Sequence, residues 1–380
     1  MFIKEIKISN FRNLKSLELL SNGDFNLIVG KNAQGKSNLL EALYSLGLGR
    51  SYRTNREEDT IKFQESNAFV TGKFQHGQNE FSLAVAWDRK NRRSITKSIR
   101  YNGNPIQKLS EFIEKAPMIL FTTDDLEIIR GEPVNRRKYI DLLTSRIYST
   151  HISNLRSYRK ILEGRNKWFK LPHSNRDRHL GEIYRQKLIS IGSEIILRRL
   201  EVMEIIKPII DRLYSSIFGG ETPEIRYRTT VKNIRKKTIE DMQEAFTGTL
   251  DNLRSNEFYR KFTLAGPHRD DFDLRLRGKS MRSFASMGEI RSMSVILKLA
   301  GVELISEKTG LEPIVLIDDC LNEFDREHIE KFLDFLMGKR QIFYATTELH
   351  SYFKKIQDIS FFIMEKGEIK PCSQSALEKL

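Results

Sequence analysis

The fold of this chain is decided by residues 25–37, which read FNLIVGKNAQGKS. The apolar run 25–29 predicts a buried strand, and the apolar spacing over 36–46 predicts a helix. The turn between them, residues 30–37, matches the pattern G-x-x-x-x-G-K-[ST], whose glycines let the backbone fold around a phosphate with several N–H groups pointing inward. A strand before the motif and a helix after it are the context that the motif requires. The sequence therefore predicts a nucleotide-binding loop.

The residues of this loop have separate expected tasks. The helix directs the positive end of its dipole at a bound anion. Lys36 is expected to reach the β- and γ-phosphates of ATP, and Ser37 to bind Mg²⁺. The alternative is a fortuitous glycine turn ahead of a core helix. The predicted nucleotide-contacting residues of the loop are Gly30, Lys31, Asn32, Ala33, Gln34, Gly35, Lys36 and Ser37.

The second half of the site is predicted in residues 313–319, PIVLIDD, an apolar strand that ends in two acids. In an open α/β sheet, the carboxyl end of a strand opens onto the ligand crevice. Asp318 is expected to hold Mg²⁺, directly or through water, and Asp319 to act as general base toward the attacking water. With Lys36 they are the predicted catalytic residues. The alternative is an ordinary turn, and the pairing with the phosphate loop favours the functional interpretation.

Residues 286–289, SMGE, begin the helix before this strand. The Ser286 hydroxyl, the Gly288 amide and the helix N-terminus together form a further anion-binding surface. The structural alternative is a plain capping box, because Glu289 follows Ser286 at the required spacing. The position just ahead of the acidic strand favours the functional interpretation.

Composition limits the classes of function. The 380 residues include 64 Lys and Arg against 50 Asp and Glu, a net charge of +14, which indicates an anionic partner such as nucleic acid. Residues 151–200 hold twelve cations and four acids, and 12 − 4 = +8 is more than half of that excess. Two cysteines are too few for a disulfide framework or a cysteine-based zinc site. No apolar run has the length of a membrane span and no secretory segment is evident, so we expect a cytoplasmic protein without membrane attachment.

The two ends of the chain alternate predicted strands and helices, whereas the middle reads as mainly helical. We therefore expect the α/β class, with a mixed sheet and helices in a nucleotide-binding head. Residues 1–125 and 255–380 would form this head, and residues 126–254 would form an inserted helical arm that binds DNA.

Further stretches carry a resemblance to a known family. They are residues 8–14 (ISNFRNL), 51–54 (SYRT), 125–133 (DLEIIRGEP) with Arg136-Arg137, 158–162 (YRKIL) with Arg165-Asn166, 266–271 (GPHRDD) and 322–325 (NEFD). With the phosphate loop, the S-x-G-E segment and the paired acids, they make the chain similar to the P-loop ATPase heads of the ABC and SMC class. More narrowly, the chain resembles the RecF family of bacterial DNA replication, repair and recombination proteins.

The resemblance implies a mechanism. In such heads, Ser286 and Gly288 would contact the γ-phosphate of ATP held by a second copy, so that ATP bridges a homodimer. Asp325 would lie in the same interface, and Arg12 near the nucleotide base or α-phosphate. Hydrolysis would remove the bridging phosphate and release the dimer, as in a ligand-driven switch between two states.

Some positions depart from the usual patterns. ABC heads carry Glu where this chain has Asp319, and the shorter side chain withdraws the base by roughly 1.5 Å, a positioning error that costs rate. We therefore expect a slow, DNA-stimulated ATPase that serves as a timer. Met287 and Glu289 replace the usual glutamines, and residues 121–126 (FTTDDL) leave the glutamine of the magnesium-water loop unassigned. Thr346-Thr347 stands where transporter-type heads have a histidine.

The basic arm is the expected DNA-binding surface. Neutralising phosphates supplies affinity that depends on salt but not on sequence, and no sequence-reading motif is apparent. Residues 226–237 are a second candidate surface, and core packing is the favoured interpretation of Trp168-Phe169. The predicted DNA-contacting residues are Arg156, Arg159, Lys160, Arg165 and Lys167.

The resemblance also implies a cellular role. The protein would recognise single-stranded, gapped or double-stranded DNA at junctions, help to load recombinase with RecO- and RecR-like partners, and support replication restart and SOS induction. The alternative is an ABC-ATPase-coupled DNA-processing enzyme, which would need an acidic metal cluster or a toprim-like module. The sequence alone does not predict the preferred DNA structure, the ATPase rate, the residues that contact RecO- or RecR-like partners or the oligomeric state without ATP.

Overall fold

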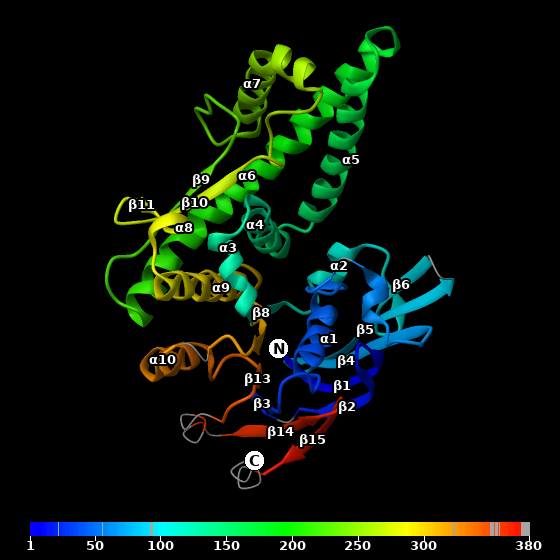
Figure 1. Cartoon of the computed structure of the whole chain (residues 1–380), viewed down its shortest axis with the longest axis vertical. Coiled ribbons are helices and arrows are strands. Elements are labelled where there is room, and N and C mark those ends of the chain that lie inside the picture. The colour runs from blue at the N-terminus through cyan, green and yellow to red at the C-terminus, as the bar shows by residue number, and fades with distance from the viewer. Residues whose placement is uncertain are drawn as a thin grey trace. The chain divides into compact units, whose positions relative to one another are not determined.

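The computed structural model describes residues 1–21, 23–54, 56–91, 94–321, 324–349, 353, 356 and 358–373. They form two compact units (Figure 1). Unit 1 consists of Met1–Asp125 and the described residues of Gly301–Leu380, and unit 2 consists of Leu126–Ala300. The predicted architecture, an α/β head built from both ends of the chain with a mainly helical insertion, is confirmed.

The second boundary of the insertion differs from the predicted one. We expected the head to resume at residue 255, but residues 255–300 belong to compact unit 2. The physical reason is strand pairing: β10 (Asp271–Leu276) lies between β9 (Glu224–Arg228) and β11 (Lys279–Ser280) in a three-stranded sheet. Helix α9 (Met287–Thr309) then crosses the boundary between Ala300 and Gly301.

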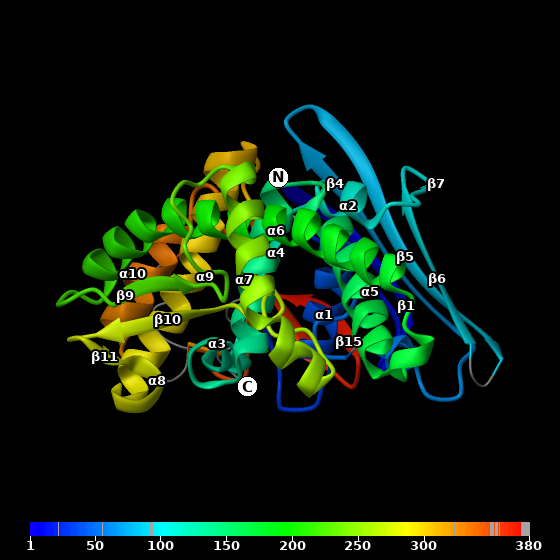
Figure 2. The ribbon, with the colours of Figure 1, turned by 90° about the horizontal axis from the view of Figure 1, so that it is seen from above.

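Unit 1 contains an antiparallel sheet in the order β2-β1-β4-β5-β6-β7. Strands β4, β5 and β6 run side by side along its length (Figure 2). Burial alternates along β4, so one face of the sheet is packed and the other is exposed. The strands are β1 (Phe2–Phe11), β2 (Leu14–Leu20), β4 (Asn67–His76), β5 (Asn79–Asn91), β6 (Ser94–Tyr101) and β7 (Asn104–Pro105).

The second sheet of unit 1 has the order β15-β14-β3-β13-β12-β8, parallel except for β15. Helix α1 (Lys36–Leu48) packs against strands of both sheets, which explains why Leu39, Leu43 and Leu46 are fully buried. The strands are β3 (Phe25–Val29), β8 (Met118–Thr122), β12 (Ile314–Asp318), β13 (Ile342–Thr346), β14 (Ile359–Glu365) and β15 (Glu368–Cys372).

The register of this sheet places the site. Asp318 is paired with Ala345 of β13 and Thr122 of β8, and Thr346 is paired with Val29 of β3. Because parallel strands end at a common edge, the turn after β3 and the acids after β12 meet there.

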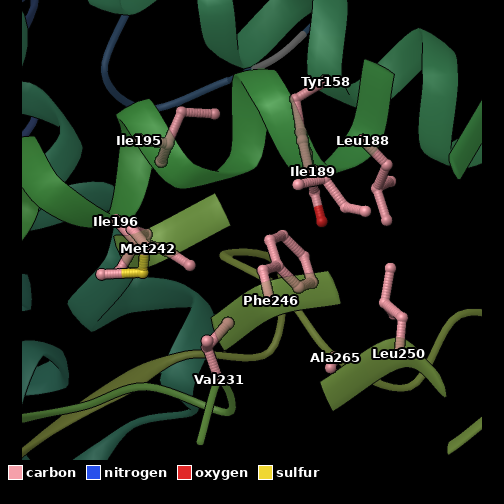
Figure 3. Close-up of a cluster of buried hydrophobic side chains, with 10 residues drawn as sticks. All are labelled: Tyr158, Leu188, Ile189, Ile195, Ile196, Val231, Met242, Phe246, Leu250 and Ala265. Carbon is pink, nitrogen blue, oxygen red and sulfur yellow. The ribbon is translucent and has the colours of Figure 1, made fainter. Parts of the chain in front are cut away.

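Unit 2 is built on helices. Helices α5 and α6 pack along one another, and α7 packs on α6 (Figure 1). Figure 3 shows the core that they enclose, in which Phe246 of α7 lies among side chains of α5 and α6, such as Tyr158 and Leu188. The helices are α3 (Glu127–Arg130), α4 (Pro133–Ile147), α5 (His151–Lys170), α6 (Arg178–Ile217), α7 (Ile239–Arg260) and α8 (Met281–Phe284).

The GPHRDD run is a buried polar turn beside this core. Gly266 has φ +126°, and a Cβ there would lie 2.3 Å from the Tyr158 hydroxyl oxygen, so no larger residue fits. That hydroxyl lies 2.8 Å from Nδ1 of His268. Asp270 accepts hydrogen bonds from the Tyr227 hydroxyl and the Thr230 amide. These bonds join α5, β9 and the turn into one packed network.

The remaining elements are two helices of unit 1 and three 3₁₀ turns. They are α2 (Leu109–Ile113), α10 (Arg326–Leu336) and the 3₁₀ turns Glu57–Thr60, Thr123–Leu126 and His173–Asn175. Among the residues described, none of the helices combines the length and the apolar character that crossing a lipid bilayer requires.

Candidate nucleotide site and nucleic-acid interface

The loop 30–37 has a backbone shaped by its glycines. Ala33 and Gly35 have φ +64° and +115°, which lets successive N–H groups turn toward one side. A Cβ on Gly30 would come within 2.3 Å of the Met364 carbonyl oxygen of β14, so only glycine allows this close approach. The Gln34 side chain accepts a hydrogen bond of 2.6 Å from the Lys366 amide, which ties the loop to the β14–β15 turn.

The electrostatics of the loop suit a phosphate. Among the described residues, no side chain caps α1 and no acid lies in its first turn, so its N–H groups keep their positive potential. Lys36 donates to the carbonyls of Gly30 at 2.7 Å and Lys31 at 3.0 Å. Burial lowers the pKa of Lys36, and the carboxylates of Asp319 and Asp318 oppose this shift. A buried ammonium held against two carbonyls of the loop fits the predicted triphosphate site.

The two predicted magnesium ligands are in direct contact. The Ser37 hydroxyl donates a hydrogen bond of 2.9 Å to Oδ1 of Asp318. Burial raises the pKa of the Asp318 carboxyl, and the hydrogen bonds from Ser37 and Tyr52 oppose the rise. No group of three or more His, Cys, Asp or Glu side chains suited to a metal occurs in the described part of the chain. One carboxylate and one hydroxyl, completed by phosphate oxygens and water, are the donor set that Mg²⁺ uses in nucleotide sites.

Asp319 has a strained backbone at φ +49°. Its amide donates to the Ala345 carbonyl at 3.0 Å, which continues the β12–β13 ladder by one bond. The Thr346 hydroxyl lies 3.5 Å from Oδ1 of Asp319. The structure thus gathers Lys36, Ser37 and both acids at one sheet edge.

Tyr52 is a residue of this site to which the sequence analysis gave no role. Its hydroxyl donates to Oδ2 of Asp318 at 3.3 Å, so the two oxygens of this carboxylate each receive a hydroxyl. The ring packs edge-on against Tyr44 of α1, with centroids 5.6 Å apart. Tyr52 belongs to the SYRT landmark, and that resemblance was the only signal that marked it.

Glu41 anchors the segment that carries Tyr52. It is fully buried on α1 and binds Nε and Nη2 of Arg12, the latter at 2.7 Å. It also accepts a hydrogen bond from Ser51 and lies 3.6 Å from Nη1 of Arg53. Arg12, which we expected near the nucleotide, is therefore held by Glu41. A glutamate inside an otherwise apolar helix stretch was the available sequence signal.

The SMGE segment begins α9 with the capping box that the sequence allowed. Ser286 and Glu289 exchange hydrogen bonds: the Ser286 amide donates to Oε2 of Glu289 at 2.8 Å, and the Glu289 amide donates to the Ser286 hydroxyl at 3.3 Å. Ser286 and Gly288 are exposed, and a Cβ on Gly288 would meet nothing within 4 Å. The cap and an anion-binding surface are compatible, because the cap leaves the Gly288 amide in the exposed first turn.

Asp325 caps α10, where its carboxylate accepts from the His328 amide at 3.0 Å. This hydrogen bond is the main cause of the lowered pKa of Asp325, whose side chain is exposed. Asn322 and Glu323 of the same landmark lie outside the described residues.

The predicted DNA-contacting cations divide into two groups. Four of the five predicted cations are exposed on α5. Lys170 lies on the same face of the helix, because the four exposed cations that follow Arg156 do so at offsets of 3, 4, 11 and 14. We call this set the α5 stripe; none of its members forms an ion pair with another described residue. The α5 stripe consists of Arg156, Arg159, Lys160, Lys167 and Lys170.

The prediction that Arg165 contacts DNA disagrees with its burial. Its guanidinium is buried and binds Glu257 at 2.7 Å and the Thr263 hydroxyl at 2.8 Å. It also lies over the Phe169 ring, 4.6 Å from the centroid. Residue 165 falls on the face of α5 that packs into unit 2, half a turn away from the stripe, so it holds the arm together instead of facing solvent.

The structure bears on two other predictions about the arm. Trp168 and Phe169 pack edge-on against Phe258, as expected for core residues. In the candidate surface 226–237, Arg226 pairs with Glu224 and Arg228 with Asp273, so part of its charge is neutralised.

Comparisons with known proteins agree with this geometry. The family model described as the RecF/RecN/SMC N terminal domain matches residues 2–370. The chain is 32% identical to the DNA replication and repair protein RecF of Oenococcus oeni over 92% of this chain and 94% of that one. It is 29% identical to the protein of the same name from Ligilactobacillus salivarius over the whole of both chains.

Solved structures give the same result. A structure described as the recombination mediator protein RecF with ATP in the RecFOR pathway superposes with a TM-score of 0.89, at 30% identity over 98% of both chains. An Smc head bound to the C-terminal winged-helix domain of ScpA superposes with a TM-score of 0.55 at 16% identity, a likeness of fold alone.

Proposed function

Because this chain belongs to the RecF family of RecF/RecN/SMC-type ATPase heads, we propose that it is a DNA replication and repair protein that ATP switches between a monomer and a DNA-binding homodimer. The observation that carries the proposal is the shared sheet edge, where Lys36, Ser37 and the Asp318-Asp319 pair come together.

We assign the residues at this sheet edge to the phosphates of ATP and to Mg²⁺. The amides of the loop 30–37 and the N-terminus of α1 hold the phosphates, and Lys36 exchanges its loop carbonyls for phosphate oxygens. Ser37 and Asp318 would hold Mg²⁺, which would neutralise phosphate charge. Tyr52 keeps the Asp318 carboxylate oriented by donating to its second oxygen.

Hydrolysis is assigned to Asp319 as the base that accepts a proton from water. The backbone at φ +49° fixes where this short side chain can reach. Since a base placed about 1 Å from its best position loses roughly a hundredfold in rate, we infer a slow ATPase that times the switch. Turnover of tens of ATP per second by protein with DNA would contradict this part of the proposal.

The homodimer is the step that uses Ser286 and Gly288. Both are exposed at the start of α9, where the Gly288 amide faces a γ-phosphate held by a second copy and the Ser286 hydroxyl exchanges its hydrogen bond to Glu289 for one to that phosphate. The exposed Asp325 is assigned to the same interface. Binding of ATP at this joint site stabilises the dimer, and loss of the γ-phosphate releases it.

DNA binding is assigned to the α5 stripe. Its fifteen residues, from Arg156 to Lys170, span fourteen helical rises or about 21 Å, which matches roughly six base pairs of B-DNA. Exposed cations without base-reading motifs support recognition of DNA structure, with single-stranded, gapped and double-stranded forms as the substrates to compare.

The cellular role follows from the family. We infer that this cytoplasmic protein acts with RecO- and RecR-like partners at gaps and stalled forks, where it helps to load recombinase, supports replication restart and contributes to SOS induction. The RecFOR pathway named for the structural relative supports these partners.

The test is the mass of the protein in solution. Wild type and Lys36→Met are compared by light scattering with ATP, Mg²⁺ and DNA. We expect wild type to double in mass with ATP and Lys36→Met to stay a monomer, because the variant loses the cation that holds the β- and γ-phosphates. A wild-type monomer under every condition would refute the ATP-driven dimer.

A further inference from the structure

An exposed aromatic ring stands beside the S-x-G-E segment. Phe284 ends the short helix α8 and is 70% exposed, although Met281 at the start of the same helix is buried. The chain from residue 282 to residue 288 is exposed at Arg282, Ser283, Phe284, Ser286 and Gly288. Single exposed rings are common on protein surfaces, so it is the position of Phe284 beside the S-x-G-E segment that sets it apart.

The ring has a fixed cationic neighbour. Lys279 of β11 places its ammonium 5.4 Å from the Phe284 ring centroid. Pairing of Leu276 with Lys279 holds this strand on β10. Arg277, in the hairpin turn, forms an ion pair of 3.3 Å with Glu289, which ties the hairpin to the start of α9. The hairpin, the ring and the capping box therefore form one surface within unit 2.

We propose that Phe284, with Lys279 stacked on it, is an anchor of the contact that this unit makes with a second copy of the chain. The proposal rests on the homodimer of the proposed function. In that dimer Ser286 reaches the γ-phosphate held by the second copy, and two residues of chain span at most about 7 Å. Phe284 must then lie at the edge of the same contact, where its ring leaves water.

The chemistry of the patch suits that occupant. The ring supplies apolar area, which Phe buries in interfaces in amounts of about 150–250 Å². Lys279 supplies positive charge beside a partner site that carries a triphosphate. A cation over a ring gains strength when both are desolvated, so the pair favours an interface over open water.

The experiment measures ATP-dependent dimerisation by sedimentation equilibrium. Phe284→Ala is compared with wild type, and Phe63→Ala is the matched control, because Phe63 is 86% exposed on unit 1. We expect Phe284→Ala to weaken the dimer about 1,000-fold, because a symmetric dimer buries two such rings and each contributes roughly 30-fold. Phe63→Ala should leave the dimer unchanged. Thermal unfolding and nucleotide binding by the monomer should be the same in all three proteins, since both rings are largely exposed.

The outcomes separate this inference from its premise. If wild type dimerises and Phe284→Ala dimerises equally well, the anchor is refuted while the homodimer stands. If Phe284→Ala keeps the dimer but loses DNA affinity, the ring serves nucleic acid and the anchor is also refuted. If wild type does not dimerise with ATP, the homodimer fails and the anchor fails with it. Retention of the dimer by Phe284→Trp, which keeps an aromatic ring, would support the anchor further.

Discussion

The substitution Arg165→Met tests whether this arginine of α5 stabilises unit 2 or contacts DNA. Arg165 and Glu257 form a buried ion pair of 2.7 Å, and Arg165 also donates to the Thr263 hydroxyl. Methionine fills the space of the arginine stem but leaves the Glu257 carboxylate without its cation. Removing one partner of such a pair costs about 3–5 kcal/mol of the free energy of unfolding, because the remaining charge stays buried.

The assay pairs urea unfolding with DNA binding measured over a range of salt concentrations. Arg159→Met is the matched control, since it makes the same substitution at an exposed position of the same helix. We expect Arg165→Met to lower the free energy of unfolding measured in urea by about 3–5 kcal/mol. Under conditions in which the variant stays folded, its DNA affinity should keep the wild-type salt dependence.

Arg159→Met should behave in the opposite way. Its unfolding free energy should change by less than about 0.5 kcal/mol, as for other surface substitutions. The slope of log affinity against log salt should fall by about 0.9, the value for one phosphate contact to B-DNA. Adding Glu257→Leu to Arg165→Met should recover part of the lost stability, because it removes the orphaned charge but also the acceptor of the Leu264 amide. A stable Arg165→Met with a reduced salt slope would refute the assignment of Arg165 to the core.

Three further changes test the site and the arm. Tyr52→Phe removes one donor to Asp318 and should weaken Mg²⁺-dependent ATP binding about fivefold in a fluorescent-nucleotide titration, without changing binding measured in EDTA; equal binding in Mg²⁺ would contradict the role given to Tyr52. Asp319→Asn should bind ATP and dimerise but fail to release the dimer, seen as a persistent doubled mass; prompt release would show that another group acts as base. Burial lowers the pKa of His268 to about 4, below its value in the unfolded chain, so the unfolded chain binds more protons between about pH 6.5 and 4. Stability should therefore fall as pH drops through that window, by at most about 1.4 kcal/mol per pH unit from this group, and a urea series on wild type and His268→Gln should show a steeper fall for wild type.

Much of unit 1 could be predicted from the sequence because its elements have strong local signals. The loop 30–37 identifies itself by glycine positions, and the strand 314–318 by a short apolar run that ends in acids. Their meeting at one edge followed from the rule that parallel strands share a carboxyl end.

The roles of individual polar residues could not be predicted in the same way. Arg165 and Lys167 are two residues apart and both basic, but only the packing of α5 decides that one faces Glu257 and the other faces solvent. Tyr52 reaches Asp318 across 266 positions of sequence, a contact that only the folded chain creates. The end of the insertion was placed too early because β10 pairs back to β9, and that long-range pairing has no local signal.

Mixing two inactive variants tests whether two chains complete each other's ATP site. Lys36→Met lacks the phosphate lysine, and Ser286→Arg blocks the surface offered to the second copy. If the site is shared, each variant alone should be inactive as an ATPase. An equimolar mixture should then recover up to about half of wild-type activity, since only mixed dimers form with ATP and each has one intact site of two. A mixture that stays as inactive as its components would contradict the shared site.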